Sequence, residues 1–185
     1  MALKRSLLLT FIEIPKGAKP TGDTSVTENA EWVLCGDGFS ELGQSNNAQT
    51  KDTQYINMDM GSTTVTGYKP TMSFSVEYTG TQADVNAPFK LDRATAYLDS
   101  IRYSGKVGAQ VRLAHVDVFT GSYNEETGWS NCNTQLFKSN VQIDSYGGTA
   151  EDPITVEGQF NIEGEPVLTT ATVTKDKRGI TLAIA

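Results

Sequence analysis

The chain contains a single histidine and only two cysteines, and these shortages exclude several classes of site. A structural zinc ion needs about four nitrogen, sulfur or carboxylate ligands, and one His with two distant Cys is a poor set. Cys35 and Cys132 are too few for a disulfide scaffold and form no C-x-x-C motif, so two reduced, partly buried thiols are expected. His115 would be the base of any Ser-His-Asp or Cys-His system, but its neighbours Ala114 and Val116 favour a structural position in a strand.

Basic residues are also few, since 15 Lys and Arg stand against 22 Asp and Glu, for a formal net charge of -7 and a pI of about 4.7. Tight nucleic-acid binding needs a basic footprint that neutralises phosphates, and the sequence has no such cluster. We therefore expect no DNA-binding function. An acidic surface past which DNA slides without being held is compatible with this charge.

The sequence lacks an apolar run of the ~20 residues that a membrane-spanning helix needs. Its first residues, MALKRSLLLTFIEIPKG, place two basic residues before Leu7–Leu9, as a secretory signal does. However, this run carries Glu13 and has no small-x-small cleavage site. We expect a strand here rather than an export signal, and no membrane partner.

Motifs for phosphate, calcium and acid-base chemistry are missing as well. Neither G-x-x-x-x-G-K-[ST] nor G-x-G-x-x-G occurs. The polar segment Gly36–Thr53 contains Asp37 and Asp52 but not the alternating ligands and terminal Glu of an EF-type loop. Glu125 and Glu126 are adjacent in a turn-like stretch, where carboxylates point apart rather than across a sugar. We predict no enzyme activity, no cofactor and no metal site.

What the sequence has in quantity is alternation of apolar and polar residues. Lys69–Thr79, Asn140–Asp144 and Ile154–Glu163 each give one dry and one wet face, as half-buried antiparallel strands do. Between Val111 and Phe119 the alternation changes phase, either because both faces are covered or because a bulge lies near Ala114–His115. The other expected strands are Ser6–Ile14, Trp32–Cys35, Tyr55–Met60, Val167–Thr174 and Gly179–Ala183.

One segment, NAPFKLDRATAYLDSIRYS, has helical periodicity instead. The residues at helical spacing are Leu91, Ala94, Leu98 and Ile101. Asn86 as a cap, Pro88 near the start and Gly105 after the end predict an amphipathic helix over residues 86–104. We predict one domain over residues 1–185, a β-sandwich or barrel of antiparallel strands with this one helix on a sheet face. Residues 1–30 would form an N-terminal strand or arm, and residues 36–54 a long loop.

Several short stretches follow one another in a characteristic order along nearly the whole chain. They are Lys4-Arg5-Ser6-Leu7-Leu8, Glu31-Trp32-Val33-Leu34 before Gly36 and the polar segment, Thr66-Gly67-Tyr68-Lys69-Pro70-Thr71-Met72-Ser73-Phe74, the helix after Asn86-Ala87-Pro88, Val141-Gln142-Ile143-Asp144-Ser145-Tyr146-Gly147-Gly148, and Gly164-Glu165-Pro166-Val167. Their joint order resembles the tail tube (major tail) proteins of long-tailed phages, particularly those of Gram-positive hosts. The Thr-rich segment Ala18–Asn29 departs from that pattern, and we interpret it as a local decoration.

The resemblance implies a structural virion protein whose subunits form hexameric rings. Strands from six subunits would close an inner β-barrel, and stacked rings would form the hollow tail tube through which DNA passes at ejection. The implied partners are other copies of the chain, a tape-measure protein, and terminator or baseplate proteins, with assembly in the host cytoplasm. Six copies at -7 give 6 × (-7) = -42 per ring, and like charge along a channel lets DNA pass without being held.

Two sets of candidate site residues follow from this interpretation. The polar segment is expected to reach an adjacent subunit or ring through Phe39, Leu42, Gln44, Asn46, Asn47, Lys51 and Asp52. The acidic residues expected at the lumen or its rim are Glu77, Asp144, Glu157 and Glu163. We also expect that deleting Ser45–Lys51 leaves a folded monomer that stacks poorly.

Two other functions remain open at this stage. A carbohydrate- or receptor-binding β-sandwich could use Trp32, Trp129, Tyr123 and Tyr146 as aromatic platforms. A tail terminator or baseplate protein could share the tube fold, and self-assembly of the purified chain would distinguish these functions from the tube.

Overall fold

The computed structural model describes residues 8–15, 30–36, 38–53, 62–81, 85, 90–105, 108–149, 152–176 and 179–185. Its elements, in chain order, are β1 (Leu8–Pro15), β2 (Ala30–Leu34), β3 (Phe39–Ser45), β4 (Ala48–Thr53), β5 (Ser62–Tyr68), β6 (Thr71–Glu77), β7 (Gly80–Thr81), β8 (Lys90–Leu91), α1 (Arg93–Ser104), β9 (Gln110–Asp117), the 3-10 turn η2 (Val118–Thr120), β10 (Ser122–Asn124), β11 (Gly128–Gly147), β12 (Thr155–Asp176) and β13 (Gly179–Ile184). The prediction of a mainly antiparallel β fold with one α-helix is confirmed for the described residues. Their helix is too short to cross a membrane.

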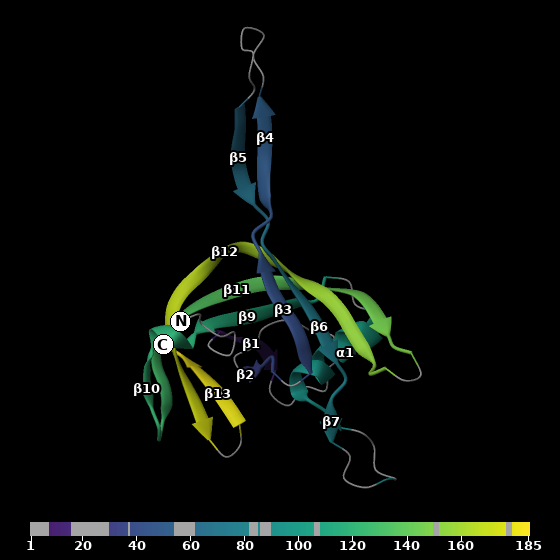
Figure 1. The fold of residues 1–185 in the computed structure, drawn as a ribbon, viewed down its shortest axis with the longest axis vertical. Coiled ribbons are helices and arrows are strands. Elements are labelled where there is room, and N and C mark those ends of the chain that lie inside the picture. The colour runs from purple at the N-terminus through teal and green to yellow at the C-terminus, as the bar shows by residue number, and fades with distance from the viewer. Residues whose placement is uncertain are drawn as a thin grey trace.

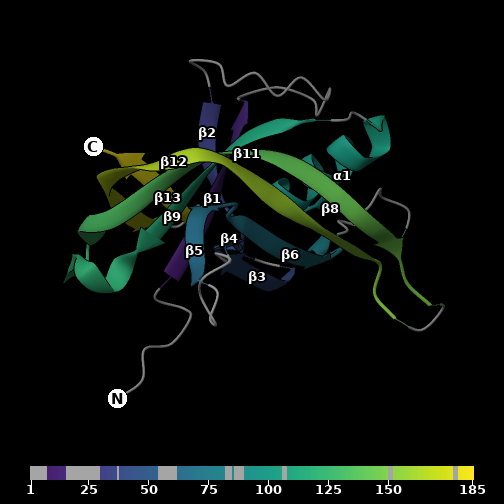
Figure 2. The same cartoon turned by 90° about the horizontal axis from the view of Figure 1, so that it is seen from above.

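Most strands belong to one sheet with the order β2-β1-β9-β11-β12-β6-β3, to which β10 and β13 add beside β11 and β12. All of its pairings are antiparallel. The long strands β11 and β12 arch across the whole domain and connect its two ends (Figure 1). Viewed from above, β1 and β2 cross the direction of β12 steeply, which shows how strongly the sheet twists (Figure 2). The described strands do not close into a barrel, because β2 and β3 are the two ends of the sheet.

The sheet packs a different hydrophobic core at each end, on opposite faces, and β9 passes between them. Val111 and Leu113 belong to the first core, whereas Ala114 and Val116 belong to the second. The pairings of β9 with β1 and β11 run without a register shift. The phase change in the sequence therefore reflects coverage of both faces, and the alternative of a bulge near Ala114–His115 is wrong.

The first core lies between α1 and the sheet. Its buried members are Ile12, Ile14, Cys35, Leu42, Met72, Phe74, Val76, Ala94, Tyr97, Leu98, Ile101, Ala109, Val111, Leu113, Phe137, Val141, Val156 and Phe160. The second core contains Phe11, Ala114, Val116, Val118, Cys132 and Val173, with Trp32, Trp129 and residues of β13 packed against it. Cys35 and Cys132 are buried free thiols, as expected.

The helix starts later than the sequence pattern suggested. Asp92 is the N-cap, because its Oδ2 accepts a hydrogen bond from the backbone N–H of Ala94 at 3.2 Å. Lys90 and Leu91 just before it pair with β7 instead of continuing the helix. Asn86 and Pro88, which were expected at the helix start, lie outside the described residues. The predicted end at Gly105 is confirmed, and its φ of 60° is the left-handed conformation that glycine adopts readily.

The segment expected to be a long loop over residues 36–54 contains two strands instead. β3 adds to the main sheet beside β6, and β4 pairs with β5 in a separate two-stranded hairpin. A bulge between Phe39 and Glu41 breaks the period-2 pattern of β3 and hides it in the sequence. β4 packs on no core, so its sequence AQTKDT shows no alternation at all. The strand expected at Tyr55–Met60 lies outside the described residues.

The remaining strand expectations are largely confirmed. β12 unites the two segments expected at Ile154–Glu163 and Val167–Thr174 into one strand. The N-terminal strand begins, within the described residues, at Leu8, and the next strand at Ala30.

Candidate functional site

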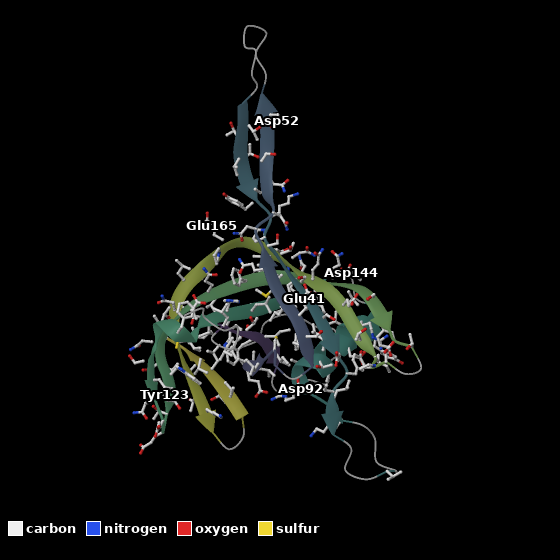
Figure 3. All side chains as sticks on the ribbon, in the orientation of Figure 1. Glu41, Asp52, Asp92, Tyr123, Asp144 and Glu165 are labelled. Atoms are coloured by element: carbon white, nitrogen blue, oxygen red, sulfur yellow. The ribbon has the colours of Figure 1, made fainter. Side chains whose placement is uncertain are left out.

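One face of the sheet, opposite the first core, is polar over four adjacent strands. Alternate residues of β6 are buried in the first core, so the residues between them point to the other side. The same rule applies to β3, to the first half of β12 and to the second half of β11. We call this surface the polar face; its residues are Glu41, Gly43, Ser45, Thr71, Ser73, Ser75, Glu77, Lys138, Asn140, Gln142, Asp144, Ser145, Glu157, Gln159, Asn161 and Glu163. Figure 3 labels Glu41 and Asp144 on it.

Side chains on the polar face bond to one another across the strands. Gln159 and Asn161 on β12 both donate to Oε1 of Gln142 on β11, each at 3.1 Å. Ser145 donates to Glu157 at 3.0 Å. These bonds join amide, hydroxyl and carboxylate groups of neighbouring strands on the side of the sheet opposite the first core. The polar face is therefore a connected hydrogen-bonded surface.

The polar face is acidic, and it brings together all four residues expected at the lumen or rim. Glu77, Asp144, Glu157 and Glu163 lie on it, from three different strands. Lys138 is its one cation, and its Nζ lies 3.6 Å from the carboxylate of Glu163.

Sequence reasoning missed a fifth carboxylate on this surface. Glu41 accepts a hydrogen bond from Ser73 Oγ at 3.1 Å. It was overlooked because β3 was taken for a loop. The alternation of Glu41, Gly43 and Ser45 with the buried Leu42 was the available signal.

An ion pair borders the polar face on the β1–β9 side. Arg112 Nη1 lies 3.3 Å from Glu13 Oε2, and the Glu13 side chain is only 10% exposed. Burial raises the pKa of the Glu13 carboxyl, and the attraction of Arg112 partly opposes that rise. The pair adds no net charge to the acidic surface beside it.

The hairpin of β4 and β5 projects beyond the sheet, along the direction of β3 and β6 (Figure 1). Lys51 and Asp52, two of the predicted contact residues, lie on it and are exposed. Val65 and Tyr68 are 50% and 63% exposed on the same hairpin. A lone two-stranded hairpin is marginally stable in water, so exposed apolar side chains on one favour a contact with another molecule.

Gln44, Asn46 and Asn47 lie at the joint between the body and this hairpin. Asn47 has a φ of 40°, a conformation that few residues other than Gly and Asn adopt. Its Nδ2 donates to Lys69 O at 3.1 Å and to Thr71 Oγ1 at 2.9 Å, across to the β5–β6 chain. Asn47 thus turns the segment between β3 and β4 and hydrogen-bonds to the segment between β5 and β6. These two features fix the point at which the hairpin leaves the sheet.

Two of the predicted contact residues do not lie in an exposed loop. Leu42 is buried in the first core, and Phe39 is partly buried against it, because β3 joins the sheet and turns both side chains inward. Contacts between copies through these two residues stay a prediction.

The residues considered for acid-base and metal chemistry lie on different elements of the structure. His115 lies on β9 with Thr10 Oγ1 3.3 Å from its Nδ1 and Asp117 4.0 Å from its Nε2. Among the described residues, no three His, Cys, Asp or Glu side chains lie close enough together to hold a metal ion. Glu125 and Glu126 lie in the exposed turn between β10 and β11.

The four aromatic residues considered for carbohydrate binding do not form one platform. Trp32 and Trp129 pack against the second core, and Tyr123 stacks on Trp129 with ring centroids 5.1 Å apart. Tyr146 lies elsewhere, under the guanidinium of Arg102 at 3.8 Å. Trp32 and Trp129 thus pack on a core, whereas Tyr123 and Tyr146 remain 62% and 48% exposed at separate places.

No family model and no curated protein matches the chain. Among solved structures, a chain of the anti-feeding prophage baseplate is similar over 88% of this chain and 92% of that one, with a TM-score of 0.43 and 6% sequence identity.

Proposed function

We propose that this chain is the tail tube protein of a long-tailed phage, of the type found in phages of Gram-positive hosts. Its role is structural rather than enzymatic, and it requires no cofactor. The observation that carries the proposal is the polar face, an acidic, hydrogen-bonded surface spread over four antiparallel strands and backed by a core. A tube needs such a surface for its lumen, because one face of the sheet must meet water and DNA while the other packs.

The charge of the polar face suits transit of DNA rather than binding. Its five carboxylates, from Glu41, Glu77, Asp144, Glu157 and Glu163, face one cation, Lys138. In a ring of six copies this excess repeats around the channel. A field of the same sign as the phosphates keeps the polyanion from adhering to the wall.

The projecting hairpin is the proposed contact between subunits of adjacent rings. Its described side chains are exposed, and its apolar residues Val65 and Tyr68 are available for contact with a partner surface. A contact of this kind joins different surfaces of two copies, so it repeats along an axis and produces a tube. Further partners under this proposal are a tape-measure protein inside the tube and terminator or baseplate proteins at its ends. The chain would assemble in the host cytoplasm and reside in the virion tail.

Negative-stain electron microscopy of the purified protein tests the proposal, with rings or hollow tubes as the expected result. A variant in which residues 48–68 are replaced by an Asn-Gly turn should fold and fail to stack. Tyr68→Ser should shorten or abolish tubes because it removes an exposed contact side chain. The matched control is Tyr103→Ser on α1, whose side chain is 84% exposed and should be dispensable. Tubes of normal length from the hairpin-less variant would refute the stacking role, and a wild-type protein that stays monomeric would refute the tube.

A further inference from the structure

A row of side chains crosses five strands at the border between the second core and the polar face. Directly opposite residues of neighbouring strands share one side of a sheet. The register of β1 with β9 continues to Glu13 and Arg112, one step beyond the pair of Ile12 and Leu113. From β2 to β12 the row consists of Trp32, Glu13, Arg112, Lys138 and Glu163. Its charged groups therefore follow one another as acid, base, base, acid.

The two bases of this row are like charges on directly opposite residues, an arrangement that by itself destabilises a sheet. Each is offset by an acid on its other side. Arg112 Nη1 lies 3.3 Å from Glu13 Oε2, and Lys138 Nζ lies 3.6 Å from Glu163 Oε2. The side chains of Arg112 and Lys138 are nevertheless 40% and 57% exposed. Both cations can be reached from solvent, while their charges are cancelled within the row.

Glu13 carries its charge there at a cost to the fold. Its side chain is 10% exposed, and its Oε2 accepts no hydrogen bond from the part of the chain that the structure describes. Arg112 reaches across β1 and lies 5.7 Å from the centroid of the Trp32 ring, so these two side chains cover the carboxylate. Burial raises the pKa of Glu13 more than Arg112 lowers it, so the charged form makes the fold less stable. Stability therefore does not explain why this residue is an acid.

We infer that Arg112 and Lys138 form a phosphate-binding pair on the polar face, and that Glu13 and Glu163 keep this pair neutral. The inference rests on the proposed function for its ligand, the phosphates of DNA in the channel, but the pair itself belongs to one folded chain. A guanidinium and an ammonium on opposite residues can contact neighbouring phosphate groups. The contact is conditional, because each cation is occupied by a carboxylate as long as that carboxylate is charged.

Acidification is a direct way to unmask the pair. The charged group beside Glu13 is Arg112 from β9, and Lys138 from β11 lies one strand further. On the other side β2 presents the uncharged Trp32, since Glu31 points to the opposite side of the sheet. Because the pKa of Glu13 is raised above 4.5, its protonation begins in milder acid than for an exposed Glu. Arg112 would then be free to bind phosphate.

A charge-matched pair of double variants tests the inference. Glu13→Gln/Glu163→Gln removes both masking charges and changes the net charge from -7 to -7 + 2 = -5. The control, Glu31→Gln/Glu126→Gln, has the same net charge of -5. It also releases an arginine, because Glu31 forms an ion pair with Arg93, but it leaves the row intact. The readout is the fluorescence anisotropy of a labelled DNA duplex, which reports binding by single chains and by assemblies alike.

Only the variant without the masking charges should bind the duplex at neutral pH. Two phosphate contacts per chain give a slope of log K against log salt of about -1.8. The affinity should therefore fall on the order of 10-fold between about 50 and 200 mM salt. Inorganic phosphate should displace the duplex more effectively than chloride at equal ionic strength, and a third change, Arg112→Gln, should abolish binding.

The single variant Glu13→Gln separates the role of the charge from a role in folding. Gln has the shape of Glu without the charge, so the midpoint of denaturant unfolding at neutral pH should stay unchanged or rise. Its affinity for the duplex should exceed that of the wild type at neutral pH, and the difference should shrink as acid protonates Glu13. A difference that does not change with pH would overturn the role of Glu13.

The outcomes also separate this inference from the tube. Equal binding by the two double variants would overturn the pair, because net charge alone would then explain it. Folded variants that bind no duplex would overturn it as well, whether or not tubes form. Binding restricted to Glu13→Gln/Glu163→Gln in a chain that never assembles would support the pair and refute the tube.

Discussion

The charge of the polar face can be reversed at one residue, and the consequence for DNA can be estimated. Glu157 lies on the polar face between β11 and β6, exposed, with its carboxylate accepting a hydrogen bond from Ser145. Glu157→Lys changes each subunit from -7 to -5, so a ring of six changes from -42 to 6 × (-5) = -30. All six new cations would lie in the channel. A duplex inside the tube would meet them together.

The size of the effect follows from counterion release. If each of the six lysines contacts one phosphate, the slope of log K against log salt should be about -5. Retention of DNA should therefore weaken on the order of 10³-fold between about 50 and 200 mM salt. Wild-type tubes should retain no DNA over the same range, because their channel repels it.

The assay is co-sedimentation of a labelled duplex with assembled tubes at the two salt concentrations. The matched control is Glu126→Lys, which makes the same change in net charge in the exposed turn between β10 and β11. We expect retention by Glu157→Lys tubes alone. Equal retention by both variants would show that net charge decides the behaviour, and no retention by either would show that Glu157 does not face the channel.

Two further predictions concern packing and geometry. Gly158→Ala should lower the free energy of unfolding by about 1–3 kcal/mol in denaturant unfolding, because its Cβ would lie 2.1 Å from Gln142 O and 2.9 Å from Phe74 Cζ. The control is Gly43→Ala on β3, whose Cβ would lie 3.6 Å from its nearest neighbour. That variant should change the free energy of unfolding by less than about 0.5 kcal/mol. Asn47→Ala should leave the unfolding of the body almost unchanged but impair tube formation, because the left-handed turn and its bonds across the joint are lost, whereas normal tubes would show that the joint does not direct the hairpin.

The strands most accurately predicted are those with one wet and one dry face. β6 and the first half of β12 alternate regularly because each residue meets either the first core or water. β3 escaped prediction because its bulge shifts the pattern after two residues. The start of α1 escaped because Asp92 and Asn86 are both good caps, and the pairing of β7 with β8 decides between them.

Residues of the candidate site, like the strands, were predicted where the sequence alternates and missed where it does not. The four acidic candidates were found because each is a polar residue in an alternating strand, and the structure places all four on one face. The contact candidates were placed less accurately within the fold. Leu42 was assigned to an exposed loop but is buried in the first core, because the direction of a side chain cannot be inferred when its strand is taken for a loop.

The sequence by itself determined the class of fold, the acidity, and which side chains of the alternating strands avoid the core. These properties are local, since period-2 patterning and composition act within a few residues. Only the tertiary structure decided that four strands distant in sequence share the polar face, and that β9 separates two cores. Strand order and register arise from packing between segments that are far apart along the chain, and no local pattern records which strands become neighbours.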